Sequence, residues 1–202
     1  MRKVNAPVLF GKYIFASSYS ATQFEFSSVD PSHCESAYVP LFSTDSMEIV
    51  LSNPILRRVD KTIYISKNPL TKKYLDVCVS VQLANSGGQD QWLEGKEKLN
   101  CGWCDKCLRT LLTLEIIGKL DGYDEIFDME KYKEHREQYI YSVIRDYDRN
   151  LFYQEIYSLM HEHDFRVPKH LIIKAKGYRF LRRGYLLIWS IKRYVFNKMK
   201  RT

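Results

Sequence analysis

The amino-acid sequence predicts a mixed α/β fold that is rich in helices. Residues 8–16 are dense in β-branched and aromatic side chains, as strands are. Several later segments repeat apolar residues at helical spacing behind capping residues. Apolar residues make up 45% and charged residues 27% of the 202 residues, which is a globular composition and excludes a largely disordered chain.

The N-terminal part is expected to contain one strand, or a strand pair, at residues 8–16. The polar, Ser-rich residues 17–44 should form a long loop with short ordered pieces, and a loop of this length inside a domain usually has a function. Thr44 or Asp45 can cap a short helix that runs to about residue 52, where Asn53 and Pro54 end it.

The middle of the chain is expected to be helical on both sides of a polar insertion. Residues 59–66 fit either a strand or a helical turn, and Pro69 is suited to the first position of a helix that runs to about residue 77. A convincing helix begins at Asp105, because leucines and isoleucines recur along one face and Gly118 is a natural residue to end it.

The C-terminal part is expected to be helical throughout, apart from one linker. Helices are predicted at about 129–147 and 150–163, with Asp128 and Asn150 as caps. Residues 165–176 should be a linker that contains Pro168, and residues 177–200 should form a basic, aromatic helix or helix pair.

The positive charge of the chain is concentrated at its C-terminal end. The net charge is +7, and residues 166–202 contain twelve Lys or Arg and no Asp or Glu, which leaves −5 on the first 165 residues. Such asymmetry suggests an anionic partner. Residues 177–202 interleave aromatic and basic side chains, which suits an anionic membrane surface. Docking of this helix on the chain's own core or on a partner is favoured at least as much, and nucleic acid is the least favoured partner.

Four cysteines have the spacing of a metal site. Cys101, Cys104 and Cys107 follow a C-x2-C-x2-C pattern, and Cys78 is the natural fourth ligand. Gly102 gives the backbone freedom that this tight turn needs. The sequence therefore predicts one structural zinc ion with four thiolate ligands and no open coordination position. A redox pair, an iron–sulfur cluster and buried cysteines without a ligand remain as alternatives.

The string NCGWCDKCLRTLLTLEIIGKL, preceded by YLDVC, resembles the C-terminal part of PP-loop ATP pyrophosphatases. The similarity is to the 7-cyano-7-deazaguanine synthase-like members of this adenine nucleotide alpha hydrolase-like group. In that family four cysteines hold zinc and an Arg follows, as Arg109 does here. A second stretch, from Val39 to Lys61, is similar in style, so that the resemblance covers roughly residues 10–125.

The resemblance implies an ATP-dependent ligase or synthase that adenylates a small molecule and releases pyrophosphate. The N-terminal S-G-G-x-D-S loop of the family, which binds pyrophosphate, does not occur at the start of this sequence. Ser86-Gly87-Gly88-Gln89-Asp90 is a near-match, but Gln91 replaces the final Ser and a poor helix follows, so we expect an insertion turn. ATP is therefore expected only if a separate PP-loop domain or subunit supplies its site.

Eight residues are candidates for substrate or nucleotide binding. They are hydroxyl and cationic side chains after the first strand, around the second similar stretch and beside the cysteines: Ser17, Ser18, Ser43, Thr44, Arg58, Lys61, Lys106 and Arg109. Solvated surface positions are the alternative for the cations. No catalytic residue is predicted.

The sequence thus predicts three parts. Residues 1–125 form a PP-loop-type C-terminal region with the zinc site, residues 126–165 a helical extension and residues 166–202 the basic tail. The alternative to a ligase subunit is a non-enzymatic, zinc-stabilised interaction module. The lack of a recognisable secretory signal and of an apolar run long enough to span a bilayer favours a cytoplasmic location, where thiols stay reduced. Attachment to the inner face of the membrane through the tail is a further expectation.

Overall fold

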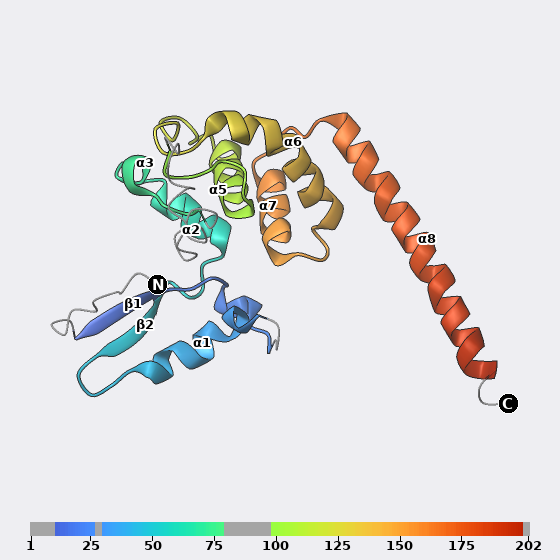
Figure 1. The fold of residues 1–202 in the computed structure, drawn as a ribbon, viewed down its shortest axis with the longest axis horizontal. Helices are drawn as coiled ribbons and strands as arrows, with labels where there is room; N and C mark the ends of the chain where they lie inside the picture. The colour runs from blue at the N-terminus through green and yellow to red at the C-terminus, as the bar shows by residue number, and fades with distance from the viewer. Residues whose placement is uncertain (1–10, 27–29, 79–97, 200–202) are drawn as a thin grey trace, which may run out of the picture. The chain divides into compact units, whose positions relative to one another are not determined.

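The computed structural model describes residues 11–26, 30–78 and 98–199, and Figure 1 shows its ribbon. The chain divides into two compact units, residues 1–128 and 129–202. Most of the ordered elements are helices, and one small parallel sheet accompanies them in the first unit. The predicted helix-rich α/β class is confirmed at this level, whereas the PP-loop fold stays a prediction.

Strands β1 (Lys12–Ala16) and β2 (Glu48–Ser52) form the sheet of the first unit. They are parallel, and their register pairs Lys12 with Glu48 and Ala16 with Ser52. The first pair also forms an ion pair of 3.0 Å between Lys12 Nζ and Glu48 Oε2. Strand β1 confirms the predicted strand for residues 12–16.

The described residues of the connection between the two strands contain four short helical pieces, which confirms the expected loop with ordered segments. They are η1 (Ala21–Gln23), η2 (Pro31–Cys34), α1 (Glu35–Tyr38) and η3 (Val39–Phe42). A parallel pair needs such a long crossover, because a tight hairpin joins only antiparallel strands.

The helix predicted from Thr44 or Asp45 to residue 52 is wrong. Thr44 instead forms an isolated antiparallel bridge with Met47, and residues 48–52 are strand β2. The segment contains three consecutive apolar residues, Ile49 to Leu51, which suit either element by periodicity alone. Pairing with β1, a contact across the crossover, decides in favour of the strand.

Among the described residues of the first unit, three further helices are α2 (Arg58–Ile65), α3 (Thr71–Tyr74) and α5 (Asp105–Ile116). The undecided segment 59–66 is therefore a helix, and the helix predicted to run to residue 77 is a single turn that ends when Leu75 becomes extended. Helix α5 confirms the prediction, and Gly118 follows it with φ of +66°, as a C′ glycine does.

Helix α5 lies at the centre of the first unit's core. Every residue from Cys107 to Leu114 is buried, so this helix has no fully solvated side along these two turns. It packs against α2, whose Val59 is fully buried, and Tyr123 and Phe127 are also buried in this unit. A helix covered on all sides is a rigid support for groups near its N-terminus.

The second unit consists of helices α6 (Met129–Asp146), α7 (Leu151–Glu162) and α8 (Lys169–Met199). Both α7 and α8 pack on α6, as Figure 1 shows, and Ile140, Val143 and Ile156 are buried in this unit. The predicted helices at 129–147 and 150–163 are confirmed. The Asn150 side chain caps α7 by accepting hydrogen bonds from two backbone N–H groups at 2.9 and 3.2 Å.

The linker predicted for residues 165–176 is mostly helical. Helix α8 begins at Lys169, and the carbonyl of Pro168 accepts the backbone N–H of Leu171 at 3.0 Å. Proline is tolerated there because the first turn of a helix needs no internal N–H donor. The described ranges contain no helix with both the length and the apolar character needed to cross a bilayer.

Candidate metal centre

The sulfur atoms of Cys78, Cys101, Cys104 and Cys107 lie within 4.8 Å of one another. The Sγ atoms of Cys101 and Cys107 are 3.9 Å apart, which is far longer than a disulfide bond of about 2.05 Å. Four thiolates about 2.3 Å from one ion at tetrahedral angles would be separated by about 3.8 Å. The four cysteines therefore fit a single metal ion.

The turn from Cys101 to Cys104 brings two of these sulfurs together. Gly102 has φ of +74°, and a Cβ built on it would lie 2.0 Å from the backbone oxygen of Asp128. The backbone N–H of Cys104 donates to Cys101 Sγ at 3.3 Å, as in many metal-binding turns. Cys104 is the N-cap of α5, so Cys107 lies in its first turn. The predicted role of Gly102 in the turn is confirmed.

Asn100 connects the segment that carries Cys78 to the turn. Its side-chain Nδ2 donates to the Leu75 carbonyl at 2.8 Å and more weakly to that of Ile126 at 3.3 Å. Its Oδ1 accepts the N–H of Val77 at 2.9 Å. The side chain is fully buried. Asn100 thus positions the residue before Cys78, a role that the sequence analysis missed although an amide next to a cysteine pair offers both donors and an acceptor.

The local electrostatics favour the neutral thiol in the absence of a cation. The hydrogen bond with Cys104 and burial raise the pKa of Cys107 far above its ordinary value, and burial also raises the pKa of Cys101. A metal ion binds the thiolate, so it must displace protons from these groups when it enters. Proton release should therefore accompany metal binding.

A group of hydroxyl and cationic side chains lies at the carboxyl end of β1. Lys61 Nζ donates to the carbonyl of Ser17 at 3.0 Å and to its hydroxyl oxygen at 2.7 Å. Arg58 Nη2 donates to the Ser18 carbonyl at 3.4 Å. Ser17 is 97% buried, since only 3% of its surface is exposed. Two cations of α2 thus lie against the residues that follow a parallel strand.

Arg109 of α5 lies near the same group. It is 5% exposed, and its charge and that of Arg58 act on the hydroxyl of Tyr19. Burial, together with a hydrogen bond of 3.1 Å to Asp30, nevertheless raises the pKa of Tyr19 to about 12. We name Ser17, Ser18, Arg58, Lys61 and Arg109 the cationic cluster; all five are among the predicted binding residues.

One buried carboxylate belongs to this region and was missed by the sequence analysis. Glu35, which is 7% exposed, accepts the backbone N–H of Ser18 at 2.7 Å. Glu35 lies seventeen residues from Ser18, so only the fold brings them together. The carboxylate offsets part of the positive charge and orients the peptide between Ser17 and Ser18, whose carbonyl accepts the hydrogen bond from Lys61.

The remaining three predicted binding residues lie elsewhere. Ser43 and Thr44 are exposed in the turn before β2, where the Ser43 hydroxyl accepts the N–H of Ile49 at 2.9 Å. Lys106 is exposed in the first turn of α5. Their proposed roles stay predictions. The near-match to a phosphate loop, residues 86–90, lies outside the described residues.

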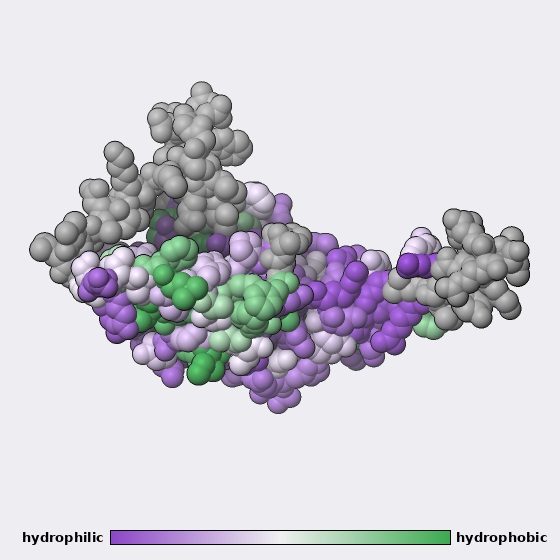
Figure 2. All heavy atoms as spheres, turned by 90° about the horizontal axis from the view of Figure 1, so that it is seen from below, coloured by the Kyte–Doolittle hydropathy of each residue, from purple (hydrophilic) through white to green (hydrophobic). Residues whose placement is uncertain are grey.

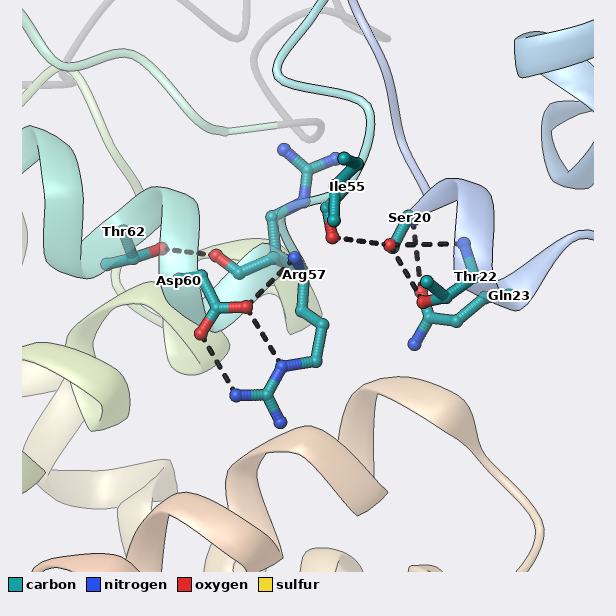
Figure 3. A network of polar contacts seen from close by, with 8 residues as sticks. Ser20, Thr22, Gln23, Ile55, Arg57, Asp60 and Thr62 are labelled. Carbon is teal, nitrogen blue, oxygen red and sulfur yellow. Dashed lines mark hydrogen bonds and ion pairs between the residues drawn. The ribbon is translucent and has the colours of Figure 1, made fainter.

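A polar network holds α2 against the segment after β1, as Figure 3 shows. The Ser20 hydroxyl donates to the Ile55 carbonyl at 2.7 Å, and the N–H of Ala21 donates to the Pro54 carbonyl at 2.6 Å. Arg57 binds Asp60 through two guanidinium nitrogens at 2.9 and 3.0 Å, and these bonds lower the pKa of the Asp60 carboxyl. The network fixes the position of α2, and hence of the cationic cluster.

Comparison with known proteins identifies no relative. No family model, no curated protein and no solved structure matches the chain.

Proposed function

We propose that this chain is a zinc-stabilised part of an ATP-dependent ligase or synthase that adenylates a small molecule and releases pyrophosphate. A PP-loop domain, in the same or a separate chain, would supply the ATP site. The cationic cluster at the carboxyl end of β1 would bind an anionic part of the substrate or nucleotide. The observation that carries the proposal is that Arg58 and Lys61 donate hydrogen bonds to the residues after a parallel strand, while the charge of Arg109 acts on Tyr19 in the same segment.

The metal is proposed to be zinc in a structural role. Four sulfurs within 4.8 Å of one another suit the edges of one tetrahedron. Ligands of an iron–sulfur cluster bind different iron atoms, so they do not share one tetrahedron of this size. Four thiolates also leave no coordination position for a substrate or water. Zinc here would hold the chain together and would not take part in the reaction.

The metal centre and the cationic cluster are linked through α5. Cys107 and Arg109 are two residues apart in the first turns of this buried helix. A bound ion that fixes Cys107 therefore also fixes the start of the helix that carries Arg109. A planar guanidinium in this position is well suited to a phosphate or carboxylate group. This link explains how a structural metal would support a binding site.

The surface around the sheet supports the need for a further domain. Parallel sheets are normally covered on both faces, and two strands alone are marginal in water. In β1, however, Ile14 is 64% exposed, and Leu41 and Phe42 of η3 are 80% and 64% exposed. Figure 2 shows green hydrophobic patches on the side of the molecule where these elements lie. An added domain would cover apolar groups of this kind.

Exchange of labelled pyrophosphate into ATP tests the activity. The zinc-loaded chain is mixed with ATP, labelled pyrophosphate and candidate small carboxylates, alone and with any PP-loop protein encoded beside it. We expect exchange only in the mixture. Absence of exchange in both preparations counts against the ligase.

Isothermal titration with AMP and pyrophosphate tests the cationic cluster separately. Lys61→Gln should weaken binding by tenfold or more, because it removes a charge from the cluster while its amide still donates to Ser17. Lys119→Gln is the matched control, since it removes an exposed cation just after the C-terminal end of α5, and it should bind as the parent does. Equal loss in both variants would show nonspecific charge attraction and contradict the cluster.

A non-enzymatic, zinc-stabilised interaction module is the second candidate. The specific observation in its favour is the long basic helix α8, which begins after Arg166 and contains no acidic residue. In this function the chain would be cytoplasmic and would attach to the inner face of the membrane through the tail. Attachment without nucleotide or pyrophosphate binding would favour the module over the ligase.

A further inference from the structure

In the part of α8 whose side chains the structure describes, one face of the helix packs on the rest of the second unit. Leu171 and Ala175, four residues apart, are 5% and 1% exposed. About two helical turns after Ala175, Arg182 forms ion pairs with Asp146 at 3.4 Å and with Asp148 at 2.7 Å. These side chains belong to the same side of the helix. The inner face of α8 is thus fixed by apolar packing and by paired charges.

Another face carries large apolar side chains that the second unit does not cover. Ile173 is 70% exposed, Phe180 is 78% and Leu181 is 71%. Residues seven and eight apart return to one side of a helix, so these three form a stripe, which we name the outer stripe. Tyr185, 68% exposed, lies at its edge. A helix that only docks on its own unit would have polar residues here.

Exposed cations of α8 flank the outer stripe, and the helix itself carries no acidic residue beside them. Lys176 and Arg183 are exposed, and no Asp or Glu occurs between residues 166 and 202. In Figure 2 the part of the molecule that leads to the C-terminal end of α8 is largely purple, that is, hydrophilic. Three acidic residues elsewhere in the second unit, Glu137, Asp146 and Asp148, pair with His170 and Arg182 of α8.

We propose that α8 binds the surface of an anionic lipid bilayer, with the outer stripe inserted among the acyl chains and the flanking cations at the phosphate level. The combination of an apolar face with Lys and Arg beside it is the pattern of helices that lie in the membrane interface. Long cationic side chains extend from such a position to the headgroups. The proposal rests on the second candidate function, the interaction module, and names its partner and the residues that bind it; it is independent of the ligase, because it concerns only the second unit.

Two other occupants fit the stripe less well. Duplex nucleic acid would neutralise the cations but would leave Ile173, Phe180 and Leu181 in water. A second copy of the chain would cover the stripe but would place two strongly positive helices together without acidic residues between them. A bilayer with anionic lipids satisfies both the charge and the apolar side chains.

Sedimentation with lipid vesicles tests the proposal on the full, zinc-loaded chain. Vesicles of phosphatidylcholine alone are compared with vesicles that also contain phosphatidylglycerol, each at low and high salt. We expect at least tenfold tighter binding to the anionic vesicles, and weaker binding at high salt. Equal binding to both vesicle types, or none to either, would overturn the proposal.

Paired variants separate insertion from simple charge attraction. The double variant Phe180→Gln/Leu181→Gln should lower affinity for anionic vesicles by about tenfold or more, since two inserted apolar groups are lost. Leu41→Gln/Phe42→Gln, an exposed apolar pair in η3, is the matched control and should bind as the parent does. Lys176→Gln/Arg183→Gln should weaken binding by about fivefold for each cation removed.

Circular dichroism with zinc present checks that each variant keeps its helices. Unchanged vesicle binding by the folded Phe180→Gln/Leu181→Gln variant would refute insertion. If the parent does not bind vesicles but forms a dimer that this variant loses, the outer stripe binds a second copy of the chain and the membrane proposal is refuted. Tighter parent binding to duplex DNA than to anionic vesicles would also refute it.

Discussion

Substitution of Asn100 by Ala should destabilise the first unit and weaken its metal site. The side chain makes three hydrogen bonds, to the Leu75 and Ile126 carbonyls and from the Val77 N–H. The Ile126 carbonyl also accepts the Asn100 backbone N–H at 2.8 Å, so it keeps a partner in the variant. The Leu75 carbonyl and the Val77 N–H lose theirs.

The expected loss follows from these two groups. Asn100 has no exposed surface, so water does not readily replace its side chain. A buried group left without a partner costs about 1–3 kcal/mol, so the two groups together cost about 2–6 kcal/mol of unfolding free energy. Because Val77 precedes Cys78, the ligand also becomes less well positioned, and zinc affinity should fall along with stability.

Urea unfolding followed by circular dichroism, at a fixed concentration of free zinc, measures the loss. Competition with a coloured chelator measures zinc affinity. Asn68→Ala is the matched control: its Oδ1 accepts one backbone N–H, from Leu70 at 3.0 Å, but the residue is exposed. It should cost less than about 1 kcal/mol. Equal effects of the two substitutions would refute the assigned role of Asn100.

Three further predictions concern the turn, the ion pair of α2 and the thiols. Gly102→Ala should lower the unfolding free energy by at least about 3 kcal/mol, because the new Cβ would lie 2.0 Å from the Asp128 backbone oxygen. The purified variant should also contain less zinc. An unchanged melting temperature with full zinc content would contradict this geometry. The pKa of Asp60 is lowered mainly by its hydrogen bonds with Arg57. The ionised carboxylate should therefore contribute less than about 1 kcal/mol to the unfolding free energy above pH 4, and this contribution should be lost as the pH falls through the folded pKa. The unfolding free energies of the parent and Asp60→Asn should therefore differ at neutral pH and converge in acid; a difference that grows in acid would show the opposite sign. Zinc affinity should rise by tenfold or more per pH unit near neutrality, since the raised pKa of Cys107 means that zinc displaces at least one proton. Calorimetry in two buffers of different ionisation enthalpy measures this proton release. A zinc affinity that does not change with pH would exclude proton release.

Local signals in the sequence predicted the metal centre and the helices near it. The C-x2-C-x2-C spacing identified three of the four clustered sulfurs, and Gly118 and Asn150 marked helix ends through short-range backbone chemistry. Each of these features depends on residues only a few positions apart. Such signals survive in the fold because no distant contact competes with them.

Features that depend on distant contacts were harder to predict. Strand β2 was expected to be helical, because nothing within Glu48–Ser52 announces its pairing with β1. Glu35 and Asn100 were missed because their partners lie seventeen to twenty-six residues away. The start of α8 was placed too late because Pro168 is compatible with a linker and with the beginning of a helix.

X-ray absorption at the zinc edge on the metal-loaded chain tests the central claim most directly. The four-cysteine site predicts one zinc per chain and four sulfur neighbours at about 2.3 Å, with one sulfur fewer, or no bound zinc, in Cys78→Ser. Four sulfurs retained in Cys78→Ser, or bound iron with a second iron nearby, would contradict it.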